Sequence, residues 1–419
     1  MSDLFRSDNV VVRSVPASDL SRWVVTFDNY GIGHGFDRPG FGEEFLRNAG
    51  ISAIHVMGVR EDWYQYPEMP AAMQAVRQAT AGAERVMTYG SSMGGYAALR
   101  FADAAGANAV LAISPQYSID PKKAPFEKRW LQDSQRIRWL PGIDGRIVCQ
   151  VRPVVVFDPS KEDGLQIALI QRDIDIVPIR LHHVSHPATT YLGEVGLLKG
   201  LVLQTLSGEL EADTFALKAR RLRRTSGVYV SNLALNQPEH RRELALSLAR
   251  RSVEVSPGSP LASMALAKLL SRAGRHDEAV EQFERIMDAT NRDPNYLVPY
   301  TEVLFAGGRH PEALAHAREA VEAMPHLAHL HAWESALLWA GSENTAAVAA
   351  LERAIALDPH RKRYRKLMRT YRREIRLHAI IRAKSVARRW IVRLARALSR
   401  TRTSSAALDQ DADRGCGEA

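Results

Sequence analysis

The sequence predicts two regions of different fold class. An α/β region with a mainly parallel sheet fills the first half of the 419 residues, and an all-α array of helical repeats follows it. Three observations predict this division. Short β-rich runs alternate with helical patterns up to about residue 205, as in a parallel sheet covered by helices. The β signal ends near Gly208, and a 34-residue repeat begins after it. The length itself predicts two or three domains.

Seven apolar runs of the first region have the composition of strands. Helical patterns such as Met73–Thr80 and Tyr96–Ala105 separate most of them. The segment Asp120–Arg146, which holds Trp130 and Trp139, breaks the alternation and is expected to form a small cap over a site. The predicted strands are Val10–Val15, Trp23–Phe27, Ile51–Met57, Arg85–Tyr89, Ala109–Ile113, Arg152–Phe157 and Asp175–His182.

The second region contains an internal repeat. The heptapeptide AGRHDEA at Ala273–Ala279 returns as GGRHPEA at Gly307–Ala313, 34 residues later. An Ala is followed by a Pro 12 residues later in three places that share one register: Ala245 with Pro257, Ala313 with Pro325, and Ala347 with Pro359. This pattern resembles the tetratricopeptide repeat, in which small residues lie where two helices touch and Pro ends the second helix.

About four such units are expected over residues 229–360. The unit around Ala279 departs from the pattern, because Asn291 stands where Pro is expected and Pro294 follows three residues later. The predicted organisation is an α/β region over 1–208, a charged connecting helix over 209–228, repeats over 229–360, a basic amphipathic helix over 361–402 and a disordered tail over 403–419.

The positive charge is concentrated in one segment. Residues 361–402 hold 17 of the 56 Lys and Arg residues and one acid, Glu374, so the net charge of +9 becomes −7 without them. Leu367, Tyr371 and Ile375, followed by Trp390, Leu394 and Leu398, recur at helical spacing. Such a helix could lie on an anionic membrane or cap the repeat array. Nucleic-acid binding is not expected, because recognisable base-reading folds are absent.

The stretch RVMTYGSSMGGYAALRFA is the most informative in the chain. Gly90, Ser92 and Gly94 fit the pattern G-x-S-x-G, between a predicted strand and a predicted helix. Strand, sharp turn and helix form the context in which a nucleophile elbow exposes its serine. Small residues at Gly90, Gly94 and Gly95 suit this turn, because larger side chains would collide with the strand or the helix. The pattern alone also occurs in glycine-rich turns and phosphate-binding loops, although this one lacks the Walker lysine.

An acid and a histidine follow in the order that α/β hydrolases use, which is nucleophile, acid, histidine. The region 1–205 therefore resembles the α/β-hydrolase fold. The resemblance implies that Ser92 attacks an ester-like carbonyl, that His186 takes its proton, and that Asp163 or Asp158 orients His186. Asp158 ends a strand, whereas Asp163 would open the next helix, where the family more often has its acid. His182 and His183 are alternatives to His186 but are expected to be structural or surface residues.

The resemblance also implies an oxyanion hole. Its first donor would be the backbone N–H of Met93, the residue after the nucleophile. The second would come from the glycine-rich loop after Trp23–Phe27, where Asn29 is the candidate. This loop lacks the H-G-G-G pattern of many lipases. Trp63, Tyr64 and Gln65 follow the next strand and would either wall the pocket or pack on the fold.

The sequence thus predicts a serine hydrolase, an esterase or deacylase acting on a small-molecule or glycan acyl ester. An acyltransferase would use the same residues, and a non-catalytic scaffold is the alternative from another class. No cofactor and no metal are expected. The repeats would bind a protein partner. The sequence shows neither a secretory signal nor an apolar stretch of membrane-spanning length, so a cytoplasmic protein is expected, held at the inner membrane face if residues 361–402 bind lipid. The two cysteines, Cys149 and Cys416, do not suggest a disulfide framework.

Overall fold

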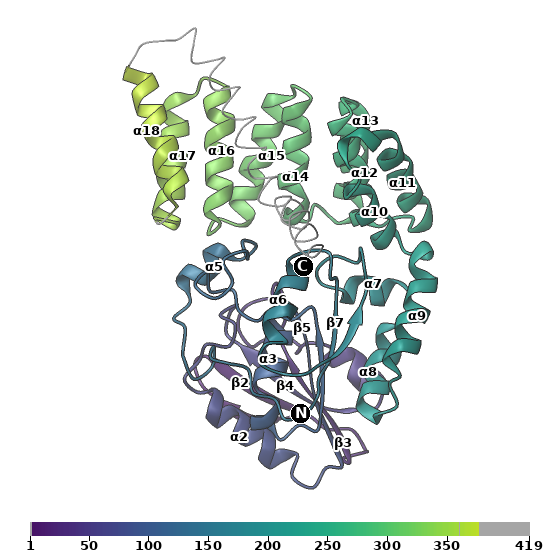
Figure 1. Cartoon of the computed structure of the whole chain (residues 1–419). Helices are drawn as coiled ribbons and strands as arrows, with labels where there is room; N and C mark the ends of the chain where they lie inside the picture. The colour runs from purple at the N-terminus through teal and green to yellow at the C-terminus, as the bar shows by residue number, and fades with distance from the viewer. Residues whose placement is uncertain (1, 360, 377–419) are drawn as a thin grey trace, which may run out of the picture. The chain divides into compact units, whose positions relative to one another are not determined.

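The computed structural model describes residues 2–359 and 361–376, which form two compact units (Figure 1). The first unit ends at Tyr229 and the second begins at Val230. The predicted tail over 403–419 and the greater part of the predicted basic helix, with Trp390, Leu394 and Leu398, lie outside the described residues.

The first unit contains a sheet of eight strands in the order β1-β2-β4-β3-β5-β6-β7-β8. Strand β2 pairs antiparallel with β1 and β4, and all other neighbours are parallel. The seven predicted strands are present, and the sequence prediction missed β1, whose side chains are largely exposed and partly charged. The strands are β1 (Ser2–Arg6), β2 (Val10–Val15), β3 (Arg22–Phe27), β4 (Ser52–Gly58), β5 (Arg85–Ser91), β6 (Ala109–Ile113), β7 (Val154–Phe157) and β8 (Val177–Arg180).

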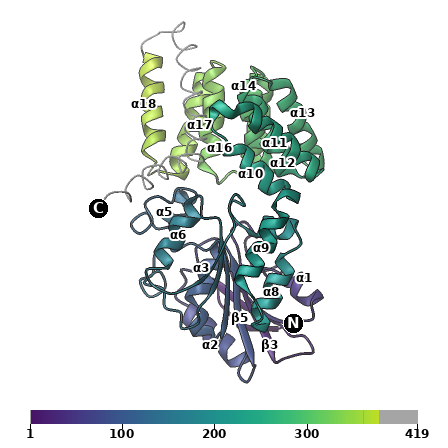
Figure 2. The same cartoon turned by 45° about the vertical axis from the view of Figure 1, so that its right-hand side comes forward.

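Helices cover both faces of this sheet, as Figure 2 shows. One face buries the apolar sides of α2, α3, α4 and α6 in a single cluster with β2 to β7. On the other face, α1 packs on β4, α8 on β5 and β6, and α9 on β8. The helices are α1 (Glu43–Asn48), α2 (Met69–Ala79), α3 (Met93–Arg100), α4 (Ala102–Ala105), α5 (Leu131–Arg136), α6 (Glu162–Ile170), α7 (Thr189–Glu194), α8 (Leu198–Ser207), α9 (Ala212–Leu222) and α10 (Gly227–Leu235).

Burial on both faces explains why the central strands are nearly continuous apolar runs. Every residue of β4 and β6 is buried, and β3 is buried from its second residue onward. A parallel sheet between two helical layers requires such strands. The carboxyl ends of β5, β6, β7 and β8 lie on one edge of the sheet because these strands are parallel and adjacent. Loops from four separate parts of the chain therefore meet there.

The second unit is an array of antiparallel helices with one spacing. Alternate helices begin at Arg242, His276, His310 and Asn344, each 34 residues after the last. The intervening helices begin at Pro260, Pro294, Ala328 and Lys362, again 34 residues apart. The helices are α11 (Arg242–Val255), α12 (Pro260–Arg272), α13 (His276–Ala289), α14 (Pro294–Ala306), α15 (His310–Ala323), α16 (Ala328–Ala340), α17 (Asn344–Leu357) and α18 (Lys362–Arg376).

Small buried residues let these helices approach one another. Ala245, Ala279, Ala313 and Ala347 occupy equivalent positions of α11, α13, α15 and α17, and each is buried. The turn after the other helix of each pair also repeats, because Gly274, Gly308 and Ser342 all have positive φ, between 68° and 82°. The irregular unit has a different connection: Asn291 and Arg292, both with positive φ, lead into α14 at Pro294.

The described part of the basic segment belongs to the array. Helix α18 packs on α17, and the ring of Tyr371 stacks on that of Trp339 with a centroid distance of 3.7 Å. Leu367 and Tyr371 are therefore buried, while Ile375 is exposed. For residues 361–376 this is the capping arrangement. Membrane binding by the rest of the segment stays a prediction. Within the described ranges, no helix combines the length and the apolar character needed to cross a bilayer.

Candidate active site

The candidate site is built on the turn between β5 and α3, where Ser92 lies. Ser92 has φ 55° and ψ −118°, a conformation that a residue with a side chain rarely adopts. Two backbone bonds fix the turn: Ser92 N donates to Ile113 O on β6 at 2.9 Å, and Tyr96 N donates to Ser92 O at 3.0 Å. The side chain is 4% exposed. The neighbouring sheet and the following helix thus hold this strained conformation.

The glycines around Ser92 are required by backbone contacts. A Cβ atom on Gly90 would lie 2.1 Å from the carbonyl oxygen of Gly94, and one on Gly94 would lie 2.4 Å from the carbonyl oxygen of Phe27. Neither neighbour is a flexible side-chain end, so the backbone itself would have to move. Gly95 is closely packed as well, 3.2 Å from Ile113 O. The expectation that small residues are needed here therefore has a direct structural basis.

The structure brings Ser92, His186 and Asp163 into one hydrogen-bonded chain. Ser92 Oγ lies 2.8 Å from His186 Nε2. His186 Nδ1 lies 2.9 Å from Asp163 Oδ2 and 3.0 Å from Oδ1. With an acceptor carboxylate at Nδ1, that nitrogen carries the hydrogen, and Nε2 is left to accept the serine proton. Serine, histidine and acid come from the ends of β5, β8 and β7, at the sheet edge where the loops meet.

The two candidate acids have separate roles in the structure. Asp163 is the second residue of α6 and faces His186. Asp158 does not contact His186. Its carboxylate instead accepts hydrogen bonds from Ser160 N and from Ser185 N, both at 2.9 Å. Asp158 therefore holds the loop that carries His186, and of the two acids left open by the sequence, Asp163 has the geometry of an orienting acid.

A second contact keeps Asp163 ionised. Burial would raise the pKa of this carboxyl group, yet His186 and Arg129 hold the pKa below its ordinary value. Arg129 Nη1 donates to Asp163 Oδ1 at 2.8 Å, and the rest of its guanidinium pairs with buried Glu127. The same carboxylate thus serves both a histidine and an arginine, so it stays charged without solvent.

The segment Asp120–Arg146 supplies Arg129 and Trp130 to this site. The Trp130 ring meets the His186 ring edge-on at 5.2 Å, and the Arg129 guanidinium lies 4.5 Å from the centre of the Trp130 ring. Tyr30 and Trp63 join Trp130 in an aromatic cluster with centroid distances of 5.6 to 6.2 Å. The segment predicted as a cap therefore contacts the histidine directly. Trp139 instead donates to Ser134 O within the segment.

Gln116, which sequence reasoning missed, also contacts the serine. Its Nε2 lies 3.1 Å from Ser92 Oγ, and its Oε1 accepts the indole N–H of Trp63 at 3.2 Å. Because the indole can only donate, the amide must present its NH₂ group to the serine. Ser92 Oγ then accepts from Gln116 and is free to donate its own proton to His186.

The two oxyanion candidates lie at the same turn. The first helical bond of α3 runs from Tyr96 to Ser92, so the N–H of Met93 lies ahead of the helical bonding pattern. Asn29 follows Phe27 and Asp28, whose carbonyl oxygens lie against Gly94. The side chain of Asn29 donates to Tyr30 O at 3.0 Å, which leaves its backbone N–H as the group to consider.

The other candidates of the sequence analysis lie in different places. Trp63 reaches the serine through Gln116, whereas Tyr64 bonds Val56 O and Gln65 bonds the hydroxyl of Tyr96 and the backbone of Leu140. Tyr64 and Gln65 therefore pack the fold. His182 and His183 precede the His186 loop and do not contact Ser92. Among residues 2–359 and 361–376, no three His, Cys, Asp or Glu side chains form a group that could hold a metal.

Gln116 and Arg129 differ in how visible they are from the sequence. Gln116 comes three residues after β6, the strand next to β5, so its position at the carboxyl edge of the sheet was a usable signal. Arg129 lies in an irregular segment, and only the folded path of that segment brings it to Asp163.

Comparison with known proteins identifies the second unit. A family model described as the tetratricopeptide repeat matches residues 239–297. Together with the 34-residue spacing, this match shows that the second unit contains tetratricopeptide repeats. A search of curated protein sequences finds no significant match.

Solved structures with similarity to the chain include proteins of this repeat class. MamA (residues 41 to end) from Desulfovibrio magneticus RS-1 is 17% identical, covers 41% of this chain and 96% of its own, and has a TM-score of 0.32. YrrB, described as a TPR protein with an unusual peptide-binding site, has 16% identity, coverages of 44% and 91%, and a TM-score of 0.31. For pilF of Pseudomonas aeruginosa the values are 18%, 42% and 77%, and 0.33.

Proposed function

We propose that the first unit is a serine hydrolase of the α/β-hydrolase type that cleaves an ester-like acyl substrate. Ser92 is the nucleophile, His186 the general base and Asp163 the orienting acid. The observation that supports this most is the unbroken chain of contacts from Ser92 Oγ through His186 to Asp163. The strained turn of Ser92 and the order of the three residues along the sequence support it as well.

In the first half of the proposed reaction, Ser92 Oγ attacks the acyl carbon while its proton moves to His186 Nε2. The imidazolium is stabilised by the carboxylate of Asp163, which Arg129 keeps ionised. The oxyanion of the tetrahedral intermediate accepts hydrogen bonds from Met93 N–H and from the backbone of Asn29. The intermediate collapses, the acyl–oxygen bond breaks, and His186 gives its proton to the departing alkoxide.

In the second half, water attacks the acyl-enzyme and His186 accepts a proton from it. The second tetrahedral intermediate then collapses, the acid is released, and the proton returns to Ser92 Oγ. An acyltransferase would differ only in the acceptor, an alcohol or amine in place of water. Trp130 and Trp63 flank the serine and histidine, and would limit water in the site.

The tetratricopeptide repeats support a second activity, the binding of a protein partner. Arrays of this kind present extended surfaces built from neighbouring helices. YrrB, with its peptide-binding site, is one structurally similar protein. A scaffold that binds partners and performs no chemistry is therefore the alternative to the hydrolase proposal.

A fluorophosphonate probe, which bonds covalently to activated serines, separates the two. The full chain should be labelled, and Ser92→Ala should abolish labelling because the attacked oxygen is gone. His186→Ala should slow labelling by about 10³-fold or more, since the serine loses its base. Ser91→Ala is the matched control and should label at the wild-type rate. Thermal unfolding of each variant establishes that it is folded.

An absence of labelling in folded wild-type protein would favour the scaffold. Equal labelling of wild type and Ser92→Ala would show that another residue reacts. Hydrolysis of short- and long-chain acyl esters by labelled-competent protein then defines the substrate class, with Ser92→Ala as the blank.

A further inference from the structure

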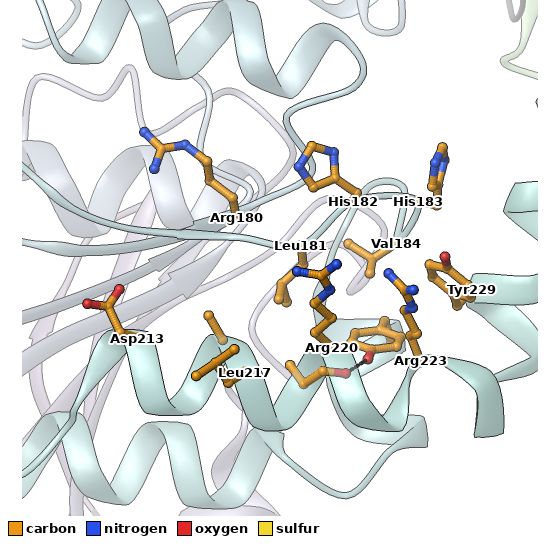
Figure 3. A pocket seen from close by; sticks show the side chains of 13 residues that line it. Arg180, Leu181, His182, His183, Val184, Asp213, Leu217, Arg220, Arg223 and Tyr229 are labelled. Carbon is orange, nitrogen blue, oxygen red and sulfur yellow. Dashed lines mark hydrogen bonds between the residues drawn. The ribbon is translucent and has the colours of Figure 1, made fainter.

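A pocket of about 710 Å³ lies in the first unit, beside the proposed active site but separate from it. Its walls are the end of β8, the loop that follows, and α9 with the residues after it (Figure 3). Volumes of this size accommodate metabolites. The loop is the one that leads to His186, although His186 itself does not line the pocket. Neither the sequence reasoning nor the proposed hydrolase function uses this pocket.

Basic side chains dominate the lining. Arg180, Arg220 and Arg223 contribute three permanent positive charges, and Asp213 contributes the one carboxylate. His182 and His183 add two groups that can be protonated. The pocket thus has a formal charge of +2 with both histidines neutral. Figure 3 shows Arg220 and Arg223 extending toward the loop that carries the histidines.

These charges are not used within the fold. In the part of the chain that the structure describes, neither Arg180 nor Arg220 forms an ion pair or a hydrogen bond, and Arg223 faces the ring of Tyr229 at 5.7 Å. Arg220 and Arg223 lie at the carboxyl end of α9, where cations favour the helix dipole. That effect does not require both to face one cavity, because Arg221 and Arg224 share the same helix end without lining it.

The loop side of the pocket has two further features. His183 has φ 60°, and its Nδ1 atom is buried without a hydrogen-bond partner among the described residues. Burial lowers the pKa of His183, so in the empty pocket its imidazole is held neutral. An unpaired nitrogen of this kind gains a partner when a hydrogen-bonding ligand enters.

Apolar surface adjoins the charges. Leu181, Val184 and Leu217 line the pocket, and Leu217 is 56% exposed, unusually open for a leucine in a helix that packs on a sheet. The Tyr229 ring forms another wall. A ligand that fits this lining has an anionic group for the arginines and a flat or apolar body for these residues.

We propose that this pocket binds a soluble small molecule that carries phosphate and a ring, of the size of a nucleoside diphosphate. Guanidinium groups bind phosphate oxygens through paired N–H donors, and a group of charge −2 matches the formal charge of the pocket. The ligand contacts the residues directly before His186, so it occupies a site next to the hydrolase centre without touching Ser92.

Isothermal titration calorimetry on the full chain tests this with two probes, inorganic pyrophosphate and adenosine diphosphate, at about 150 mM salt. Wild type should bind both, and adenosine diphosphate at least as tightly as pyrophosphate because of its ring. Arg220→Ala combined with Arg223→Ala should weaken both by about 10-fold or more. The matched control combines Arg221→Ala with Arg224→Ala, which removes the same charge from the same helix end, and should bind as wild type does.

Three results would overturn the proposal. The first is no wild-type binding of either probe at millimolar concentration. The second is equal weakening in the two double variants, which would indicate general attraction to a basic protein. The third is weaker binding of adenosine diphosphate than of pyrophosphate, which would exclude a ring-bearing ligand. All four arginines are partly or fully exposed, so thermal unfolding should differ little among the proteins. Binding is measured without turnover, so the outcome is independent of the hydrolase proposal.

Discussion

The two units use polar residues in opposite ways. In the α/β unit, charged and hydroxyl side chains such as Asp163, Arg129 and Ser92 are withdrawn from solvent and bonded to one another. In the repeats, the recurring Arg and Glu of the heptapeptide form exposed pairs three residues apart, Arg275 with Glu278 and Arg309 with Glu312. The first arrangement fixes atoms for chemistry, whereas the second contributes little beyond solubility.

Glycine shows the same contrast. Gly90 and Gly94 are needed because other backbone atoms approach within the space of a side chain. Gly274 and Gly308 have open space around them and are needed only for their positive φ. A residue type thus answers a packing demand in one unit and a conformational demand in the other. Substitutions of equal chemistry should therefore differ greatly in effect between the two units.

Removal of one carboxylate from each unit should give the largest difference. Asp163→Asn should lower the rate of ester hydrolysis or of fluorophosphonate labelling by about 10³- to 10⁴-fold, because the histidine loses its tautomer and its counter-charge. Glu278→Gln, in an exposed pair, should leave rate and stability unchanged. Stopped labelling reactions quantified by gel fluorescence provide the rates.

Asp158→Asn is the control within the first unit. It keeps a side chain that can accept from Ser185 N, and it should reduce the rate far less than Asp163→Asn. Similar losses for both variants would mean that Asp158 acts on the histidine after all.

Glycine substitutions should give the next difference. Gly94→Ala should destabilise the first unit by about 3 kcal/mol or more, since the new methyl group meets the carbonyl oxygen of Phe27. Gly308→Ala should cost the repeats about 1 kcal/mol, the penalty of a left-handed residue with a side chain. Urea unfolding followed by circular dichroism measures both, and equal costs would contradict the distinction.

The smallest expected effect has the opposite sign. Ser342 occupies the turn position that Gly274 and Gly308 occupy in the preceding repeats, with φ 68°. Ser342→Gly should stabilise the array by roughly 0.5 kcal/mol, as relief of the left-handed strain exceeds the added freedom of the unfolded chain. A raised urea midpoint with an unchanged slope is the expected result. A lowered midpoint would mean that the serine side chain contributes something this turn does not reveal.

The fold could be predicted from the sequence where residues act through local patterns. The strands between helical layers are apolar runs, and the repeats carry their spacing in every unit, so both were predicted. Strand β1 was missed because SDLFR is exposed and has no strand pattern of its own. The role of residues 361–376 was left open, although Lys362 begins at the phase set by Pro260, Pro294 and Ala328. The abundance of charge in that segment obscured the spacing.

The site was predictable as far as chain order extends. Ser92 and His186 follow from motif and order, whereas the choice between Asp158 and Asp163 depends on which way the first turn of α6 faces. Gln116 and Arg129 reach the serine and the acid across long sequence separations, through loops with no regular pattern. No periodicity encodes such contacts, so only the folded chain reveals them.

The constant phase of the helix starts has a consequence for how this protein can change over evolutionary time. Residues 276–309 span one full period, and the residues on either side of that stretch are equivalent, since Arg275 and Arg309 each precede a helix that begins with histidine. Loss or duplication of such a stretch rejoins matching helix ends, so the array can be shortened or lengthened in whole modules. The α/β unit has no comparable seam, because its centre draws on four distant loops at once.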